Sequence, residues 1–193
     1  MNTFRESDLE IAFPDDWIVR KFDATAAFRS ISGQGLKGVD FLCLAPRREL
    51  WLVEIKNFRP RAAHRTEARR HPRDLAQHVG AKFADSKRLI HIMNRALRTK
   101  WWSGPLRFWY RIVRVERPRS HYWFWLEAAR RLEEPGRVVC VLWLETPERA
   151  PDYAGATAAA LSDLVDARHS LHLAESQGRP EIPIKVRPNP SML

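Results

Sequence analysis

The pattern of apolar and polar positions divides the chain into a short N-terminal element, a strand-rich centre, a long helix and a mixed C-terminal third. Near-continuous runs of Val, Leu, Ile, Phe and Trp predict buried strands, and they occupy residues 39–44, 50–55 and 137–144. Such runs are typical of strands that are covered on both faces. We therefore expect a three-layer α/β fold, with a central mixed sheet flanked by helices.

Helical spacing is clearest over residues 73–98, where apolar positions follow one face of a long helix. Shorter patterns and their boundary residues predict three further helices, over residues 2–13, 122–133 and 156–172. These helices would cover the faces of the predicted sheet.

The remaining elements are predicted from shorter patterns. Residues 17–22 predict the first strand, residues 182–186 a last edge strand, and residues 108–115 an inserted hairpin. A chain of 193 residues is long enough to bury one substantial core. We expect a single domain over residues 1–193, with an insertion over residues 99–136.

The predicted insertion has an unusual composition. Residues 101–125 hold nine of the twenty aromatic side chains, interleaved with arginines. Such a segment suits stacked bases of a nucleic acid, a surface for a partner protein, a membrane-facing patch, or packing against the core. The sequence leaves these four interpretations open.

Charge narrows the class of partner. The net charge is +10, the isoelectric point is about 10.3, and 26 of the 33 basic residues are arginine. A surface of this kind binds nucleic acid or anionic membrane. The chain has no apolar run long enough to span a membrane, and its first residues are too acidic for a signal peptide. We expect a cytoplasmic protein with no membrane partner, and Cys43 and Cys140 as reduced core residues.

Three polar residues interrupt the central apolar strands. Asp40 opens the first, Glu54 lies near the end of the second, and Lys56 follows Glu54 on the same face because side chains alternate along a strand. Adjacent strands would bring the two carboxylates within about 5 to 8 Å if the register places them opposite or diagonally to each other. The plain alternative is a surface Glu–Lys pair on an edge strand.

This arrangement predicts a metal site for cutting phosphodiester bonds. Asp40, Glu54 and the carbonyl of Ile55 supply the oxygen ligands that Mg²⁺ prefers, with Mn²⁺ as a substitute. Metal ions activate water and offset charge on the phosphoryl oxygens. Lys56 would orient or help to deprotonate the attacking water, or act as a fixed positive charge.

Basic residues flank the predicted site on both sides. Lys37 lies in the glycine-rich stretch 32–38, which is either a flexible turn or a loop that touches substrate. Arg59 and Arg61 begin the arginine-rich connection 57–73, which either contacts phosphates or forms a solvated loop. We take all three, together with Gln77 on the predicted long helix, as candidate nucleic-acid contacts.

With Asp40 and Glu54-Ile55-Lys56 on adjacent strands, the chain resembles the PD-(D/E)XK nuclease superfamily and is similar to its nuclease-related (NERD) domain. The resemblance implies a restriction-endonuclease-like core in the order αβββαβ. It also implies a further acid from the first helix, here Glu10 with Glu6 behind it, and a glutamine on the helix after the Glu-x-Lys strand, here Gln77. Ala81 stands where the family's tyrosine would follow Gln77.

The sequence thus predicts a Mg²⁺-dependent deoxyribonuclease, either an endonuclease or an exonuclease, with RNA not excluded as substrate. The alternative is a non-catalytic module on the same fold that binds nucleic acid or docks on a partner. A homodimer and an association with another protein through the aromatic segment both stay open. Gln77 and Lys82 lie off the apolar face of the long helix, where they could reach the site or face solvent.

Overall fold

A computed structural model describes residues 1–25, 35–59, 70–99, 104–105, 108–109, 120–146, 151–175 and 181–189. Its centre is a mixed five-stranded sheet in the order β3-β4-β5-β6-β7. The strands β3, β4 and β5 pair antiparallel, and β5, β6 and β7 pair parallel. Their bounds are β3 (Ile18–Lys21), β4 (Phe41–Leu44), β5 (Leu50–Asn57), β6 (Val138–Glu145) and β7 (Ser170–Glu175).

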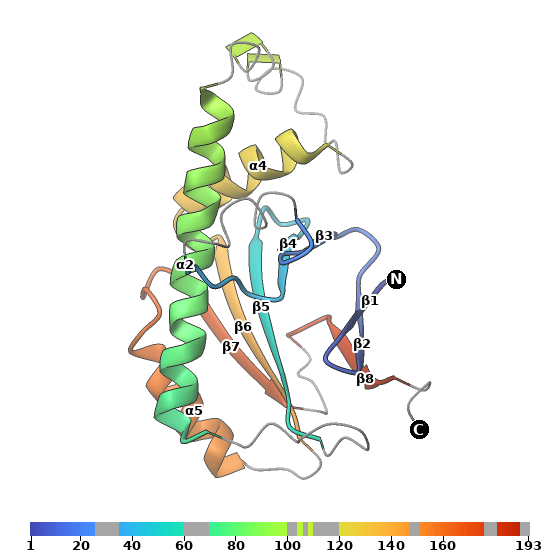
Figure 1. Ribbon diagram of the computed structural model, residues 1–193, viewed down its shortest axis with the longest axis vertical. Coiled ribbons are helices and arrows are strands. Elements are labelled where there is room, and N and C mark those ends of the chain that lie inside the picture. Colours follow the sequence, from blue (N-terminus) through green and yellow to red (C-terminus); the bar gives the residue numbers. More distant parts are fainter. Residues whose placement is uncertain are drawn as a thin grey trace.

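Three helices in the described part of the chain cover one face of this sheet (Figure 1). They are α2 (Pro72–Arg98), α4 (His121–Glu133) and α5 (Pro151–Ser162). The long helix α2 runs beside the sheet, and Pro72 suits its first turn because a proline there has no intrahelical N–H bond to lose. Ser120 caps α4 by accepting a hydrogen bond from the N–H of Trp123.

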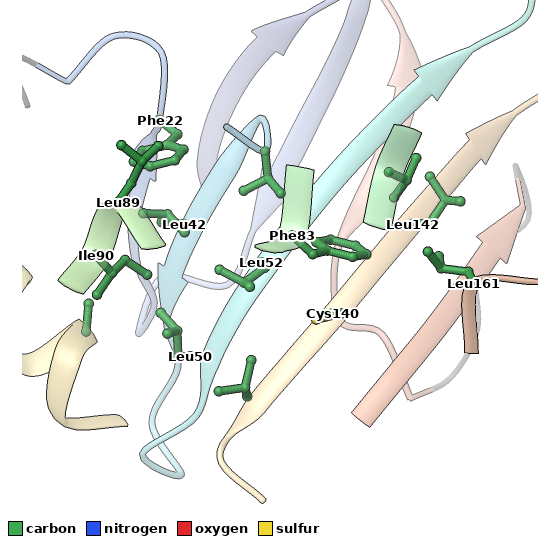
Figure 2. Close-up of a cluster of buried hydrophobic side chains, with 14 of the residues drawn as sticks. Phe22, Leu42, Leu50, Leu52, Phe83, Leu89, Ile90, Cys140, Leu142 and Leu161 are labelled. Atoms are coloured by element: carbon green, nitrogen blue, oxygen red, sulfur yellow. The ribbon is translucent and has the colours of Figure 1, made fainter. Parts of the chain in front are cut away.

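The core on the helix-covered face is continuous from β4 to β7. Figure 2 shows Phe83 of α2 by Leu52 of β5 and Leu142 of β6, and Ile90 of the same helix on the side of Leu42 and Leu50. Each fully buried side chain of this size contributes about 1.5 to 3 kcal/mol. This packing fixes α2 against the strands that carry the predicted site.

A second, antiparallel sheet covers the opposite face of the central sheet. It has the order β1-β2-β8, with β1 (Asn2–Glu6), β2 (Leu9–Phe13) and β8 (Lys185–Pro188). Ile11 and Val186 pack there against Phe41 and Val53. The expectation of helices on both faces of the sheet is therefore wrong for the described residues, since a small sheet occupies the second layer.

The N-terminal element is a hairpin, which corrects the helix expected over residues 2–13. Leu9, Ile11 and Phe13 are buried at every second position, which is the period of a strand. Ser7 and Asp8 both have positive φ, at 50° and 65°, as a two-residue hairpin turn requires. The leading helix of the expected αβββαβ order is therefore replaced by β1 and β2.

The C-terminal part of the helix expected over residues 156–172 is also corrected. The helix α5 ends at Ser162, and residues 170–175 form β7, which pairs parallel with β6. Leu171 and Leu173 pack against the helices and Ala174 packs on the other face, so the period here is two. His172 accordingly lies in β7.

Several elements agree with the sequence-based predictions. The central strands, β3, β6, α2 and α4 lie within two residues of their expected bounds. The expected edge strand near 182–186 begins three residues later, as β8, and belongs to the small sheet. Phe108 and Trp109 are helical and exposed, which contradicts a hairpin that begins there. Residues 110–115 of that expected hairpin lie outside the described residues.

Cys43 and Cys140 are free and buried, as predicted. Burial raises the pKa of both thiols, that of Cys140 to about 12, so neither is a reactive thiolate at neutral pH. Of the helices in the described ranges, none is both long and apolar enough to cross a membrane.

Candidate active site

Asp40 and Glu54 lie opposite each other on neighbouring strands. Phe41 pairs with Val53 between β4 and β5, and continuing this register places Asp40 opposite Glu54. Leu52 packs against the helices, and Glu54 two residues later shares its face. Both carboxylates therefore belong to the face of the sheet that α2 covers.

Hydrogen bonds hold the Asp40 segment from two sides. The N–H of Ile55 donates to the carboxylate of Asp40 at 2.7 Å. From α2, the buried hydroxyl of Ser86 accepts from the N–H of Val39 at 3.0 Å, and the carboxylate of Asp85 accepts from the N–H of Lys37 at 3.0 Å. The position of Asp40 is thus set by the next strand and by the helix above it.

Glu54 is fully buried and lies in the middle of the sheet. Its side chain is 0% exposed, and β5 pairs with a strand on each side. This excludes the plain alternative of a surface Glu–Lys pair on an edge strand. A buried carboxylate requires cationic or hydrogen-bonding partners, because desolvation penalises its charge.

Two lysines supply the positive charge at Glu54. The ammonium of Lys82 donates to both carboxylate oxygens, at 2.7 and 2.9 Å, and lies 3.7 Å from an oxygen of Asp40. The ammonium of Lys56 lies 3.3 Å from one oxygen of Glu54. Lys82, which comes from α2, is therefore the lysine in closer contact with the carboxylate pair.

The charged groups in this cluster shift one another's pKa values. Burial, and then the charge of Glu54, raise the pKa of Asp40 from 3.8 to about 7, although the charge of Lys82 and the N–H of Ile55 oppose the shift. Burial lowers the pKa of Lys82, but the charges of Glu54 and Asp40 outweigh it and raise that pKa overall. Lys82 stays charged at neutral pH, whereas Asp40 titrates there.

The N-terminal hairpin brings a further acid towards the site. Glu6 pairs with Lys21 at 2.7 Å, and its charge contributes to the raised pKa values of both Asp40 and Lys82. Glu10 lies opposite Arg5 and Arg187 in the small sheet. It alternates with the inward-facing residues of β2, so it belongs to the outward side of that strand.

The predicted nucleic-acid contacts have different surroundings. Lys37 and Lys56 lie near His78 of α2, together with Arg70 and Lys82. Burial lowers the pKa of His78, and the charges of all four cations lower it further. Gln77 is exposed on α2. The site is therefore bordered by positive charge on the side of α2.

Arg59 is committed to an internal ion pair. Its guanidinium contacts the buried carboxylate of Glu145 at 2.6 and 2.7 Å, at the end of β6. The backbone of Arg59 is held by the side chain of Asn57. Arg59 thus links the ends of β5 and β6, and its side chain is still 39% exposed. Arg61 lies outside the described residues.

The donor set fits a magnesium ion that keeps some of its waters. No group of three or more His, Cys, Asp or Glu side chains is placed to hold a metal within the described ranges. Mg²⁺ is commonly bound by one or two carboxylates together with water and substrate phosphates, and Asp40 and Glu54 offer that pair. The N–H of Ile55 donates to Asp40. The carbonyl of Ile55 remains the predicted third ligand of the metal.

Sequence reasoning missed three residues around the pair. The sequence pattern allows Lys82 either a site role or a surface role, predicts no role for Ser86, and places Glu6 behind Glu10 as the further acid. The available signal was the border of the apolar stripe on α2, where Lys82 and Ser86 are one turn apart and lie on the same side of Phe83. Polar side chains at such a border point towards the element on which the helix packs, which here is the central sheet.

Comparisons with protein-family models, with curated proteins and with solved structures find no match to this chain. The site must therefore be interpreted from its own geometry and chemistry.

Proposed function

We propose that the chain is a Mg²⁺-dependent nuclease that hydrolyses phosphodiester bonds in DNA. The observation that carries the proposal is the opposed pair Asp40 and Glu54, at the middle of the sheet, with Lys56 and Lys82 in contact with Glu54. A fully buried glutamate beside a second, partly buried acid is costly for stability. Such an arrangement is typical of sites that bind a cation and carry out chemistry.

Each residue has a role in this proposal. Asp40 and Glu54 would hold the metal, which would lower the pKa of a bound water and offset charge on the phosphate. Lys56 would orient the attacking water or stabilise charge in the transition state. The N–H of Ile55 and the hydroxyl of Ser86 keep Asp40 facing Glu54. Lys37, Arg70 and His78 lie where the phosphates of a bound strand would approach.

The resemblance to the PD-(D/E)XK nucleases rests on the motif and on its placement. The described fold supports it through the mixed sheet and the helix that follows the Glu-x-Lys strand. The N-terminal hairpin departs from the expected first helix, and with it the basis for Glu10 as a ligand is lost. Membership of that superfamily is therefore part of the proposal.

A second candidate is a nucleic-acid-binding module without catalysis. The contact of Lys82 with both oxygens of Glu54 favours it, because a permanent lysine–carboxylate pair needs no metal. The net charge of +10 suits either function. Metal binding and cleavage distinguish the two.

The test is a substrate panel of linear, circular and single-stranded DNA and RNA, with Mg²⁺ or Mn²⁺ and with EDTA. Wild type is compared with Asp40→Asn, and Asp152→Asn serves as control because Asp152 is an exposed acid on α5. We expect metal-dependent cleavage of DNA by wild type and Asp152→Asn, and none by Asp40→Asn. Binding of DNA without cleavage under every condition would favour the second candidate.

A further inference from the structure

We propose that Lys82 is a tethered cation that competes with Mg²⁺ for the carboxylate pair and leaves Glu54 when the metal binds. The inference rests on the proposed function, since it takes Mg²⁺ as the ligand of Asp40 and Glu54. Lys82 would thereby set the metal affinity of the site, a role that neither the motif nor the position of Lys56 assigns to it.

The contacts of Lys82 place its charge where a shared cation would be held. Its ammonium contacts both oxygens of Glu54, at 2.7 and 2.9 Å, and one oxygen of Asp40 at 3.7 Å. Two cations at such distances from the same oxygens repel each other strongly in a partly buried site. Binding of Mg²⁺ to both carboxylates therefore requires the ammonium to move.

The side chain of Lys82 is able to make that movement. Its charge is carried on a flexible four-carbon stem, and its side chain is 16% exposed, in contrast to the 0% of Glu54. It lies one turn from His78, which has Lys37, Lys56 and Arg70 around it. A displaced ammonium would join this cationic border, where the phosphates of a substrate would offset its charge.

Chemical labelling of the wild-type protein tests the movement directly. Brief acetylation with acetic anhydride is followed by mass spectrometry, without metal and with saturating Mg²⁺. We expect the labelling rate of Lys82 to rise several-fold with Mg²⁺, because its ammonium loses its carboxylate partners. Lys87, on the same helix but next to His169, is the internal control and should not change.

Calorimetric titration of Mg²⁺ tests the competition. Lys82→Gln keeps a polar side chain for Glu54 but removes the charge, and Lys87→Gln is the matched control on the same helix. We expect Lys82→Gln to tighten Mg²⁺ binding by about tenfold or more, Lys56→Gln to tighten it less, and Lys87→Gln to leave it unchanged. The charge of Lys82 lowers the pKa of Asp40, so Lys82→Gln would raise that pKa. The titration is therefore run at pH 8.5, to limit protonation of Asp40 in the variant.

The outcomes separate this inference from the proposed function. If wild type binds Mg²⁺ with the same affinity as Lys82→Gln, and the labelling of Lys82 does not respond, the competition is overturned and the metal site stands. If neither protein binds Mg²⁺ or Mn²⁺, the proposed metal site is overturned, and the competition with it. If Lys82→Gln does not fold, the labelling of wild type decides alone.

Discussion

The backbone N–H of Ile55 donates to the carboxylate of Asp40 at 2.7 Å, so the strand that carries Glu54 also orients the acid opposite it. One peptide of β5 thereby sets the spacing of the two carboxylates. The same pair is stabilised from above by Lys82 of α2. The site thus depends on the packing of α2 on β4 and β5 as much as on the motif itself.

Asp40→Asn should stabilise the metal-free protein at alkaline pH. The pKa of Asp40 is raised from 3.8 to about 7, so its contribution to stability is fully present below about pH 4 and is lost as the pH rises through about 7. The free energy of unfolding of Asp40→Asn relative to wild type should therefore rise by up to about 3 kcal/mol between pH 5 and pH 8.5. Urea unfolding in EDTA at both pH values measures this.

The matched control for that experiment is Glu133→Gln, because Glu133 is an exposed acid at the end of α4. Its stability relative to wild type should not change between the two pH values. If wild type and Asp40→Asn differ in the free energy of unfolding by the same amount at both pH values, Asp40 has an ordinary pKa.

Lys82 and Glu54 should be strongly coupled in stability. Removing one partner of a buried ion pair leaves an uncompensated charge, so Lys82→Met should lower the free energy of unfolding by about 3 to 5 kcal/mol. The double variant with Glu54→Gln should cost much less than the sum of the two single variants. Additive single effects in a denaturation cycle would mean that the pair is not formed in solution.

Ser86 should act as a positioning residue for Asp40. Ser86→Ala leaves the N–H of Val39 without its acceptor, which costs about 1 to 3 kcal/mol, and loosens the segment before Asp40. Under the proposed function, kcat should fall while KM for DNA changes little. Asp85→Ala removes the neighbouring, exposed bond to Lys37 and is the control, with a smaller effect on both stability and kcat. Equal effects of the two variants would contradict a special role for Ser86.

Arg131 should matter for stability alone. Its buried guanidinium donates to the carbonyls of Ala45 and Glu49 and pairs with Glu127, at the turn between β4 and β5 that lies away from the site. Arg131→Met should lower the free energy of unfolding by about 3 to 5 kcal/mol. The Mg²⁺ affinity of the folded fraction should equal that of wild type, and a changed affinity would show that the turn and the site are coupled.

The strands that bear the motif could be predicted from the sequence because their apolar runs match the bounds of β4 and β5 closely. The helix α2 was predictable for the same reason, since its apolar stripe extends over many turns. These elements carry their signal locally, in the period of the buried positions. The closeness of Asp40 and Glu54 was predictable because strands joined by a short turn are usually neighbours in a sheet. Their opposed position depends on the antiparallel register of β4 and β5, which the sequence left open.

The elements that were not predicted depend on contacts between distant segments. The residues of β1 and β2 have apolar positions that fit a short helix when Ile11 is ignored, and only the packing of Leu9, Ile11 and Phe13 on the sheet decides for a strand. In β7, pairing with β6 overrides the helical spacing that continues from α5. The sequence does not determine the role of Lys82, because its partner Glu54 lies 28 residues earlier in the chain.

The central claim is that Asp40 and Glu54 form a metal-dependent site for cutting DNA. It is tested most directly by incubating circular DNA with wild type and with Glu54→Gln, in Mg²⁺, with Glu133→Gln as the matched control. The proposal predicts cleavage by wild type and by Glu133→Gln, and no cleavage by Glu54→Gln although it still binds the DNA. Equal cleavage by Glu54→Gln and wild type would contradict it.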